Sequence, residues 1–257
     1  MEHATDHYVF HYPEHSTAQK DIIQISALQE ECYAYISSCL GTESIGKIHY
    51  HLFNTPEEVG RQYAVTHDND DDEPCNGFAL PDTVSKDGLN HVYAVYSDTI
   101  QCIGFHEDAH IISYSLGRPV SQFIREGLAM FFDRYWWGID NNSWSRWYLE
   151  QGKMPSIKDL LQNEYFRIYD DTITYPIAGA FTSYLIARYG MDQYIQFYQT
   201  CDDDAEQACG SAFHESITGI ETGFKRYINL FHLRKEVRRL MAADLQIPKQ
   251  EERSNEH

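Results

Sequence analysis

The chain has 257 residues, 42% of them hydrophobic, and a formal net charge of −19 at pH 7. This length and apolar content are enough for one large domain or for two lobes that share a cleft. The acidic excess argues against nucleic acid and anionic membranes as partners, because phosphate groups are bound by concentrated Lys and Arg.

Residues 1–98 are predicted to form a small lobe of mixed α and β structure. Its elements are a strand at Tyr8–Tyr12, an amphipathic helix at Ile22–Leu40, a strand at Lys47–Phe53, a helix that begins at Pro56 and a strand at His91–Tyr96. Apolar residues at helical spacing and a stop at Gly41 indicate the long helix, and alternation indicates the strands. The segment before Tyr8 is polar and rich in His, and we expect a mobile terminus there.

A metal-binding motif lies in the next predicted helix, where apolar residues recur at helical spacing from Ile100 to Leu116. The segment from His106 to His110 has the pattern H-E-x-x-H. Residues four apart on a helix project to the same side, so these two His can place two imidazole nitrogens on one metal ion. Glu107 is then beside the metal without binding it. A carboxylate in that position takes the proton from a zinc-bound water and later gives it to a leaving amine.

A third ligand is expected from the helix that follows Gly117-Arg118-Pro119. Glu126 falls in an otherwise largely apolar run from Ser121 to Phe132. Burying an unpaired carboxylate there is costly, and binding to a metal removes that cost. A catalytic zinc keeps three protein ligands and one open position for water, and two His with one Glu are a standard set. The sequence therefore predicts one Zn²⁺ per chain, held by His106, His110 and Glu126.

Beyond Phe132 the apolar pattern is almost wholly helical. The predicted helices are at Ile157–Leu161, Ile177–Tyr189, Asp192–Thr200, Ala205–Phe213 and Glu221–Ala243. The predicted fold class is thus α+β, with a small mixed lobe at residues 1–98 that places an edge strand beside the zinc helix. A mostly helical, zinc-binding catalytic lobe follows at residues 99–245, and residues 246–257 form a disordered tail.

The two motifs together resemble the gluzincin branch of the zinc peptidases, the peptidase MA-like group. Members carry His-Glu-x-x-His on one helix and Glu-Gly-x-Ala or a near variant on the next, and this chain has the segment His106–His110 followed by Glu126-Gly127-Leu128-Ala129. The resemblance implies a gluzincin-like fold and the hydrolysis of a peptide or protein substrate by a metal-activated water, with Glu107 as general base and acid.

A third segment is similar to the same group. Tyr175, followed by Gly179 and a helical pattern, resembles the helix start whose tyrosine gives a phenol to the tetrahedral intermediate in aminopeptidase-like gluzincins. A preorganised donor stabilises the negative charge that builds on the attacked carbonyl oxygen. Tyr175 is therefore the candidate oxyanion donor, and His214 is the alternative from chemistry alone.

The strand before the zinc helix bears on the kind of peptidase. Aminopeptidases of this group hold the free amine of the substrate with a Gly-x-Met-Glu-Asn strand, and the corresponding strand here, His91–Tyr96, contains no such carboxylate. That strand could instead pair with an extended substrate through its edge N–H and C=O groups. Endopeptidase activity is favoured.

Two other classes of function stay open beside the enzyme. One is a catalytically silent metal-binding scaffold that recognises a peptide without cutting it, and the other is a metal-free helical interaction domain. Glu107 favours the enzyme over the scaffold, because a structural zinc site has no use for a base and more often takes a fourth protein ligand.

Two further motifs are weaker. The segment His11–His15 matches the inverted pattern H-x-x-E-H, but Pro13 opposes a helix there, so the two His are not expected to share a helical face. The acidic run Asp68–Glu73 suggests calcium, yet it lacks the Gly and the distant Glu of an EF-hand loop. We expect a solvated loop at this position.

The sequence has no run of about 20 apolar residues, and its N-terminus has no basic region followed by an apolar one. We therefore expect neither a membrane span nor a secretory leader. A cytoplasmic location is expected, or a secreted one if a leader has been removed. None of the six Cys lies in a C-x-x-C pair, and reduced thiols are favoured. No oligomeric state is predicted.

Overall fold

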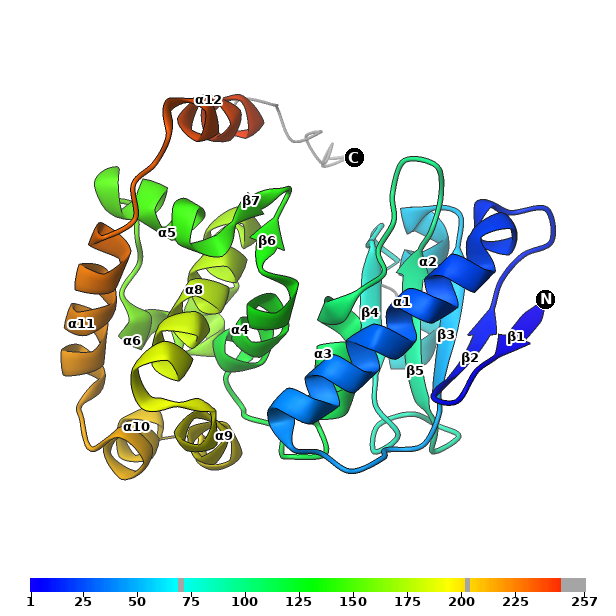
Figure 1. Ribbon diagram of the computed structural model, residues 1–257, viewed down its shortest axis with the longest axis horizontal. Helices are drawn as coiled ribbons and strands as arrows, with labels where there is room; N and C mark the ends of the chain where they lie inside the picture. The colour runs from blue at the N-terminus through cyan, green and yellow to red at the C-terminus, as the bar shows by residue number, and fades with distance from the viewer. Residues whose placement is uncertain (69–71, 202–203, 246–257) are drawn as a thin grey trace, which may run out of the picture.

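The computed structural model describes residues 1–68, 72–201 and 204–245, and it joins a five-stranded sheet to a large helical region (Figure 1). The predicted tail and the centre of the acidic run, residues 69–71, lie outside the described residues. The strands are β1 (Glu2–Ala4), β2 (Tyr8–His11), β3 (Ile48–Phe53), β4 (Gly77–Leu80), β5 (Asn90–Val95), β6 (Tyr135–Trp136) and β7 (Ile139–Asp140). The helices are α1 (Thr17–Leu40), α2 (Pro56–His67), α3 (Phe105–Ser113), α4 (Gln122–Asp133), α5 (Asn141–Glu150), α6 (Ile157–Leu160), α7 (Asn163–Phe166), α8 (Asp171–Tyr189), α9 (Met191–Thr200), α10 (Ala205–Phe213), α11 (Ile217–Asn229) and α12 (Lys235–Asp244).

The five-stranded sheet has the order β1-β2-β3-β5-β4. Strands β2, β3 and β5 are parallel, whereas β1 and β4 pair antiparallel with their neighbours at the two edges. This mixture of sheet and helix agrees with the predicted α+β class. Strand β5, which contains most of the predicted edge strand His91–Tyr96, lies inside the sheet, so that part of the prediction was wrong. The edge strand in contact with α3 is β4, which the sequence pattern did not indicate.

The two faces of this sheet differ in chemistry. One face is apolar, and its buried residues, such as Tyr8, Phe10, Ile48 and Tyr50, belong to the same core cluster as residues of α1 and α3. Figure 1 shows α1 crossing in front of the sheet. On the other face, Val59 of α2 packs with apolar residues of β4 and β5. The sheet therefore holds α3 against one face and leaves part of the opposite face to polar residues.

The N-terminal segment is part of this sheet, and the prediction of a mobile terminus was wrong. The amino group of Met1 donates a hydrogen bond to the carbonyl oxygen of Tyr12 at 2.7 Å. His7 bonds to the carboxylate of Glu30 through both its backbone N–H, at 2.9 Å, and its ring, at 2.6 Å. Local polarity gave no indication of these contacts, because the partners lie far away along the chain.

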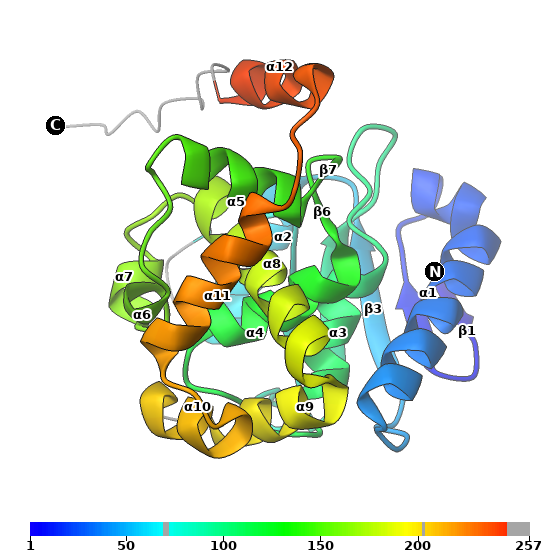
Figure 2. The ribbon, with the colours of Figure 1, turned by 60° about the vertical axis from the view of Figure 1, so that its left-hand side comes forward.

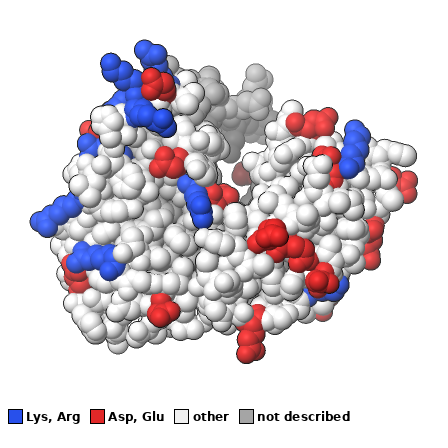
Figure 3. All heavy atoms as spheres, viewed as in Figure 1, with Lys and Arg blue, Asp and Glu red and all other residues white. Residues whose placement is uncertain are grey.

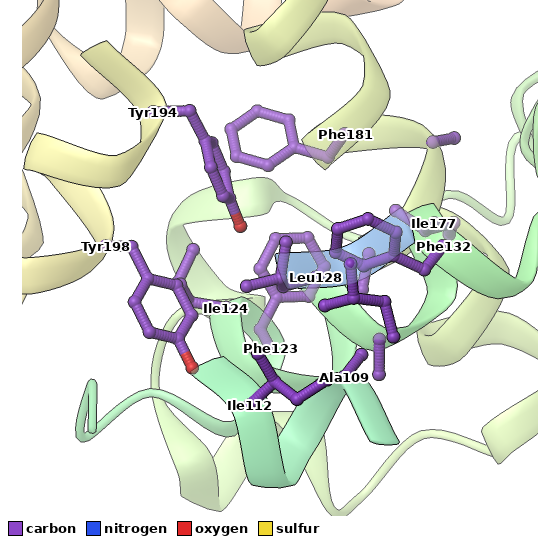
Figure 4. Close-up of a cluster of buried hydrophobic side chains, with 14 of the residues drawn as sticks. Ala109, Ile112, Phe123, Ile124, Leu128, Phe132, Ile177, Phe181, Tyr194 and Tyr198 are labelled. Atoms are coloured by element: carbon purple, nitrogen blue, oxygen red, sulfur yellow. The ribbon is translucent and has the colours of Figure 1, made fainter. Parts of the chain in front are cut away.

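The helical region is built on three stacked helices, α3, α4 and α8. Figure 4 shows the core that they share, with side chains from α3, α4 and α8 pointing toward one another and two tyrosines of α9 closing one side. Helix α11 runs alongside α5 and contacts α8 (Figure 2). The core residues labelled in Figure 4 are Ala109 and Ile112 of α3, Phe123, Ile124, Leu128 and Phe132 of α4, Ile177 and Phe181 of α8, and Tyr194 and Tyr198 of α9.

The start of α3 differs from the prediction. Helical spacing placed the start near Ile100, but the helix begins at Phe105. Gly104, the residue before this helix, has a φ of 116°, which lies outside helical geometry and favours glycine. Tyr96 and Gln101 form an isolated antiparallel bridge just before it. The chain therefore turns sharply between β5 and the motif helix.

Two C-terminal helices also differ. Helix α8 begins at Asp171, capped by the side chain of Asp170, so the helix predicted from Ile177 starts earlier and contains Pro176. The long helix predicted at Glu221–Ala243 is two helices, α11 and α12, with a break at residues 230–234. The hairpin of β6 and β7 and helices α5 and α7 were not predicted.

Charged side chains are unevenly spread over the surface. In the view of Figure 3, Lys and Arg gather over α12, and acidic side chains are spread over the half that contains the sheet. Arg238 of α12 forms an ion pair with Glu150 of α5. None of the described helices is both long enough and apolar enough to span a bilayer.

The close approach of α4 and α8 gives the first prediction. A Cβ atom on Gly127 of α4 would lie 2.6 Å from Oγ1 of Thr182 and 3.0 Å from the carbonyl oxygen of Ala178, both on α8. We expect Gly127→Ala to lower the free energy of unfolding by about 1–3 kcal/mol, because the added methyl overpacks this contact. Urea denaturation followed by circular dichroism measures the change.

A matched control is Gly210→Ala in α10, where an added Cβ meets nothing within 4 Å. It should leave stability unchanged or raise it by up to about 1 kcal/mol, because alanine is the better helix former. Equal unfolding midpoints for the two variants would show that the α4–α8 contact tolerates a methyl group.

Candidate metal centre

Helix α3 holds the two histidines of the H-E-x-x-H motif one turn apart. His106 and His110 have ring centroids 5.1 Å apart with the rings nearly perpendicular. Glu107 and Asp108 lie in the first turn, where negative charge interacts favourably with the helix dipole. The predicted pairing of the two imidazoles on one helical side is therefore present.

Glu126 of α4 reaches both histidines, as the sequence predicted. Its Oε2 atom lies 3.4 Å from Nε2 of His106 and 3.2 Å from Nε2 of His110. Ligand atoms of the three residues lie within 4.8 Å of one another. Their side chains are 24%, 9% and 12% exposed for His106, His110 and Glu126, so the group is largely shielded from solvent. Two imidazole nitrogens and one carboxylate oxygen that converge in this way fit a divalent metal such as zinc.

Asp133 adds a carboxylate that sequence reasoning missed. Its Oδ2 atom lies 4.0 Å from Nδ1 of His106, on the side of the ring away from Glu126. Carboxylates that face the second nitrogen of a metal-binding histidine fix the orientation of its ring. Asp133 lies seven residues after Glu126, which is about two helical turns, so helical spacing was the available signal.

The electrostatics of the centre are dominated by burial and by these carboxylates. Burial alone would lower the pKa of His106, but Glu126, Glu107 and Asp133 outweigh it and raise that pKa to about 9. Burial would raise the pKa of Glu126, yet His110 and His106 hold it well below its usual range. Burial raises the pKa of Asp133. So many carboxylates around two imidazoles make a site whose charge suits a dication.

Asp108, the first of the two variable residues in the motif, anchors α3 to the sheet half. It is fully buried, and its Oδ2 atom accepts hydrogen bonds from the hydroxyl of Tyr8 on β2 and, at 2.9 Å, from the side-chain amide of Gln29 on α1. The oxygen of the same amide accepts a bond from the backbone N–H of Gly104 at 2.7 Å. Gln29 thus holds the residue that precedes α3, and the position of both histidines follows from it.

Glu107 points toward the edge strand β4. A Cβ atom placed on Gly77 would lie 3.1 Å from Oε1 of Glu107, so the strand backbone passes directly beside the carboxylate. Burial raises the pKa of Glu107, and Glu126 and Asp133 act in the same direction, while both histidines oppose it. A carboxylate with a raised pKa is a better proton acceptor.

The two candidate oxyanion donors have different positions. Tyr175 lies inside α8, and its ring is nearly parallel to that of His106 with centroids 6.2 Å apart. Burial raises the pKa of the phenol well above its usual value, and Glu126 and Asp171 add to the shift, so the group keeps its proton at pH 7. His214 is exposed at the C-terminus of α10 and does not line the cleft. His214 is thus in no position to act as the alternative donor.

The three candidate metal ligands, Glu107 and Tyr175 line one cleft of about 710 Å³. Residues 76–79, which include most of β4, form one wall, and α3, α4 and α8 form the floor. The β6–β7 hairpin contributes three aromatic residues, Tyr135, Trp136 and Trp137, and Trp136 packs against Tyr175 with ring centroids 5.1 Å apart. Arg118 and Arg125 also line the cleft.

The inverted motif near the N-terminus does not form a helical site. His11 ends β2, and His15 has a φ of 59° in the loop before α1. The two His therefore share no helical face, as expected from Pro13, and the residues of this motif do not line the cleft of the metal centre.

Comparison with protein-family models gave no match, and comparison with curated proteins gave none either. The likeness to gluzincins therefore rests on the motif residues.

Metal content tests the ligand set. After dialysis against metal-free buffer the chain should keep about one zinc, and His110→Ala or Glu126→Ala should lower the occupancy sharply, because each removes one of three ligands. His214→Ala serves as the control, since its exposed ring lies outside the cleft. Elemental analysis that finds full zinc in both ligand variants would refute the assignment.

Asp133→Asn tests the carboxylate behind His106. The amide keeps the shape of the side chain but loses its charge, so we expect zinc affinity to fall by about 10- to 100-fold while the fold is retained. Competition with a chromophoric chelator measures the affinity. Unchanged affinity would mean that Asp133 has no part in orienting the ring.

Proposed function

We propose that the protein is a zinc-dependent peptide hydrolase of gluzincin type. The observation that carries the proposal is the convergence of His106, His110 and Glu126 beside a carboxylate, Glu107, that is not needed as a ligand. A purely structural site has no use for such a group. The position of these residues in an open cleft, rather than in a closed core, supports the same conclusion.

The residues around the metal centre have distinct roles in this reaction. A zinc ion bound here would supply Lewis-acid chemistry, polarising the scissile carbonyl and making water more acidic. Glu107 accepts the proton of the attacking water and gives it to the leaving amine, a role supported by its raised pKa. Tyr175 donates a hydrogen bond to the oxygen on which negative charge develops, and its raised pKa keeps the phenol protonated for that purpose.

The substrate class follows from the wall of the cleft. Strand β4 pairs on one side with β5 and has no strand on its other side among the described residues. An extended peptide can add to such an edge through main-chain hydrogen bonds. The sequence of β4, Gly77-Phe78-Ala79-Leu80, has no carboxylate to hold a free substrate amine. We therefore propose cleavage within a polypeptide, with the substrate lying along β4 above Glu107.

Glu107→Gln separates the enzyme from a silent scaffold. The amide cannot accept the proton, so peptide turnover should fall by at least about a hundredfold while zinc stays bound. The substrate comes from a mass-spectrometric screen of a mixed peptide library. Equal turnover by the variant and the wild-type chain would remove Glu107 from the mechanism, and a library left uncut by the zinc-loaded wild type would favour the scaffold.

Tyr175→Phe tests the oxyanion donor. A phenol that binds only the developing charge stabilises the transition state more than the ground state, so kcat should fall by about a hundredfold or more with KM little changed. Zinc content should stay normal, because only a hydroxyl is lost. His214→Ala is the matched control and should keep full activity. Full activity of Tyr175→Phe in steady-state kinetics would show that Tyr175 is not the oxyanion donor.

A further inference from the structure

A second group of histidines lies on the face of the sheet opposite α1 and α3. It consists of His11 of β2, His49 and His51 of β3 and His91 of β5, which together are called the histidine patch. The parallel register places His11 beside His51 and His49 beside His91. Residues two apart on a strand point to the same face, so His49 and His51 are neighbours as well. The buried residue between them, Tyr50, points to the apolar face.

The patch is organised into two pairs of facing ring nitrogens. Nε2 of His11 lies 3.2 Å from Nδ1 of His49, and Nε2 of His51 lies 3.0 Å from Nδ1 of His91. The pairs are stacked on each other, since the rings of His11 and His51 are nearly parallel with centroids 4.7 Å apart. Four imidazoles are thus held by backbone register rather than by loops.

Each pair has a carboxylate behind one ring. Nε2 of His91, the nitrogen that faces away from His51, lies 3.0 and 3.1 Å from the two oxygens of Asp87. Nδ1 of His11, the nitrogen that faces away from His49, lies 3.8 Å from Oε2 of Glu2. This arrangement, in which a carboxylate holds the outer nitrogen and leaves the inner one to face a ligand, is typical of histidines that bind metals.

We propose that the histidine patch is a second metal site, in which each histidine pair binds one divalent transition-metal ion, with Cu²⁺ bound most tightly. A metal about 2.0–2.1 Å from each nitrogen, at an angle between about 90° and 110°, holds two ligand nitrogens about 2.9–3.4 Å apart. The measured separations of 3.2 and 3.0 Å fall in this range. On binding, the metal replaces the hydrogen that the two rings of a pair share. The proton displaced from the donor ring moves to the other nitrogen of that same ring.

The patch is accessible and is independent of the centre on α3 and α4. A cavity of about 280 Å³ adjoins His91 and Asp87 of the second pair, and the side chain of His11 in the first pair is 32% exposed. The sheet separates the patch from α3, which packs on the opposite, apolar face. Each pair offers two protein ligands and the centre offers three, so the patch should bind more weakly. Imidazole sites bind Cu²⁺ more tightly than other divalent first-row metals, which makes Cu²⁺ the sharpest probe.

Copper titration of the full chain, loaded with zinc and dialysed, tests the proposal. Glycine as a weak competing chelator suppresses binding to isolated surface histidines, and equilibrium dialysis with elemental analysis counts the bound copper. Beyond any copper that enters the centre on α3 and α4, the wild-type chain should bind about two Cu²⁺, His49→Asn and His51→Asn about one each, and the double variant none. Copper that enters the centre is common to all variants and cancels in these differences. His214→Asn, which changes an exposed lone histidine, should bind as the wild type does.

Two further readouts separate binding from a structural role. Pulsed electron paramagnetic resonance should detect imidazole nitrogens on the added copper of the wild type and lose that signature in the double variant. Asp87→Asn keeps all four histidines and should weaken the second pair by about 10- to 100-fold, leaving the first pair unchanged. Copper binding by the double variant equal to that of the wild type would overturn the proposal. Abolition of all copper binding by either single variant would also overturn it, because the pairs would not act separately.

Discussion

Helix α4 carries Glu126 to the histidines of α3 because α8 packs closely behind it. Gly127 allows this approach, since any larger residue would meet the side chain of Thr182 and the backbone of Ala178. The glycine next to the third ligand therefore has a packing reason that is separate from chemistry. Gly179 of α8 has the same role on the other side, where an added Cβ would lie 2.7 Å from that of Met130. A contact between backbones is hard to adjust, so it fixes the position of α4, which carries Glu126, against α8 better than long side chains would.

The same core concentrates carboxylates where water is scarce. Glu107, Glu126 and Asp133 all lie near two imidazoles, and burying each of them carries a desolvation cost. The cost is offset in part by His106, whose pKa is raised to about 9 by these neighbours. A dication offsets it further, because it interacts favourably with all three carboxylates at once. Asp108 lies on the other side of α3 and pairs with neutral donors of β2 and α1, so its carboxylate anchors the helix instead of adding to the site.

Sequence reasoning reached the residues whose relation is local. His106 and His110 share a helical side by spacing alone, and Glu126 was identifiable as an acid inside an apolar helix. Asp133 was missed, because it lies about two helical turns after Glu126 but belongs to no motif. The edge strand could not be found in this way, because strand order depends on contacts between distant segments, and β4 is short and follows an acidic run of the sequence. The late start of α3 depends on the φ of Gly104 and on its bond to Gln29, 75 residues away, and neither is visible in the apolar pattern.

The protein presents imidazoles in two settings that differ in ligand number and in surroundings. At the centre on α3 and α4, two histidines share a carboxylate ligand in a buried site beside an open cleft. On the face of the sheet away from α3, four histidines pair with one another, and the carboxylates of Asp87 and Glu2 lie behind two of the rings. A metal bound at the centre would be held as a permanent part of the protein, because three candidate ligands are fixed by packed helices. A metal bound at the histidine patch would exchange with solution, because two ligands would leave most coordination positions to water. The parallel register that aligns β2, β3 and β5 is therefore as important for the patch as the α4–α8 contact is for the centre.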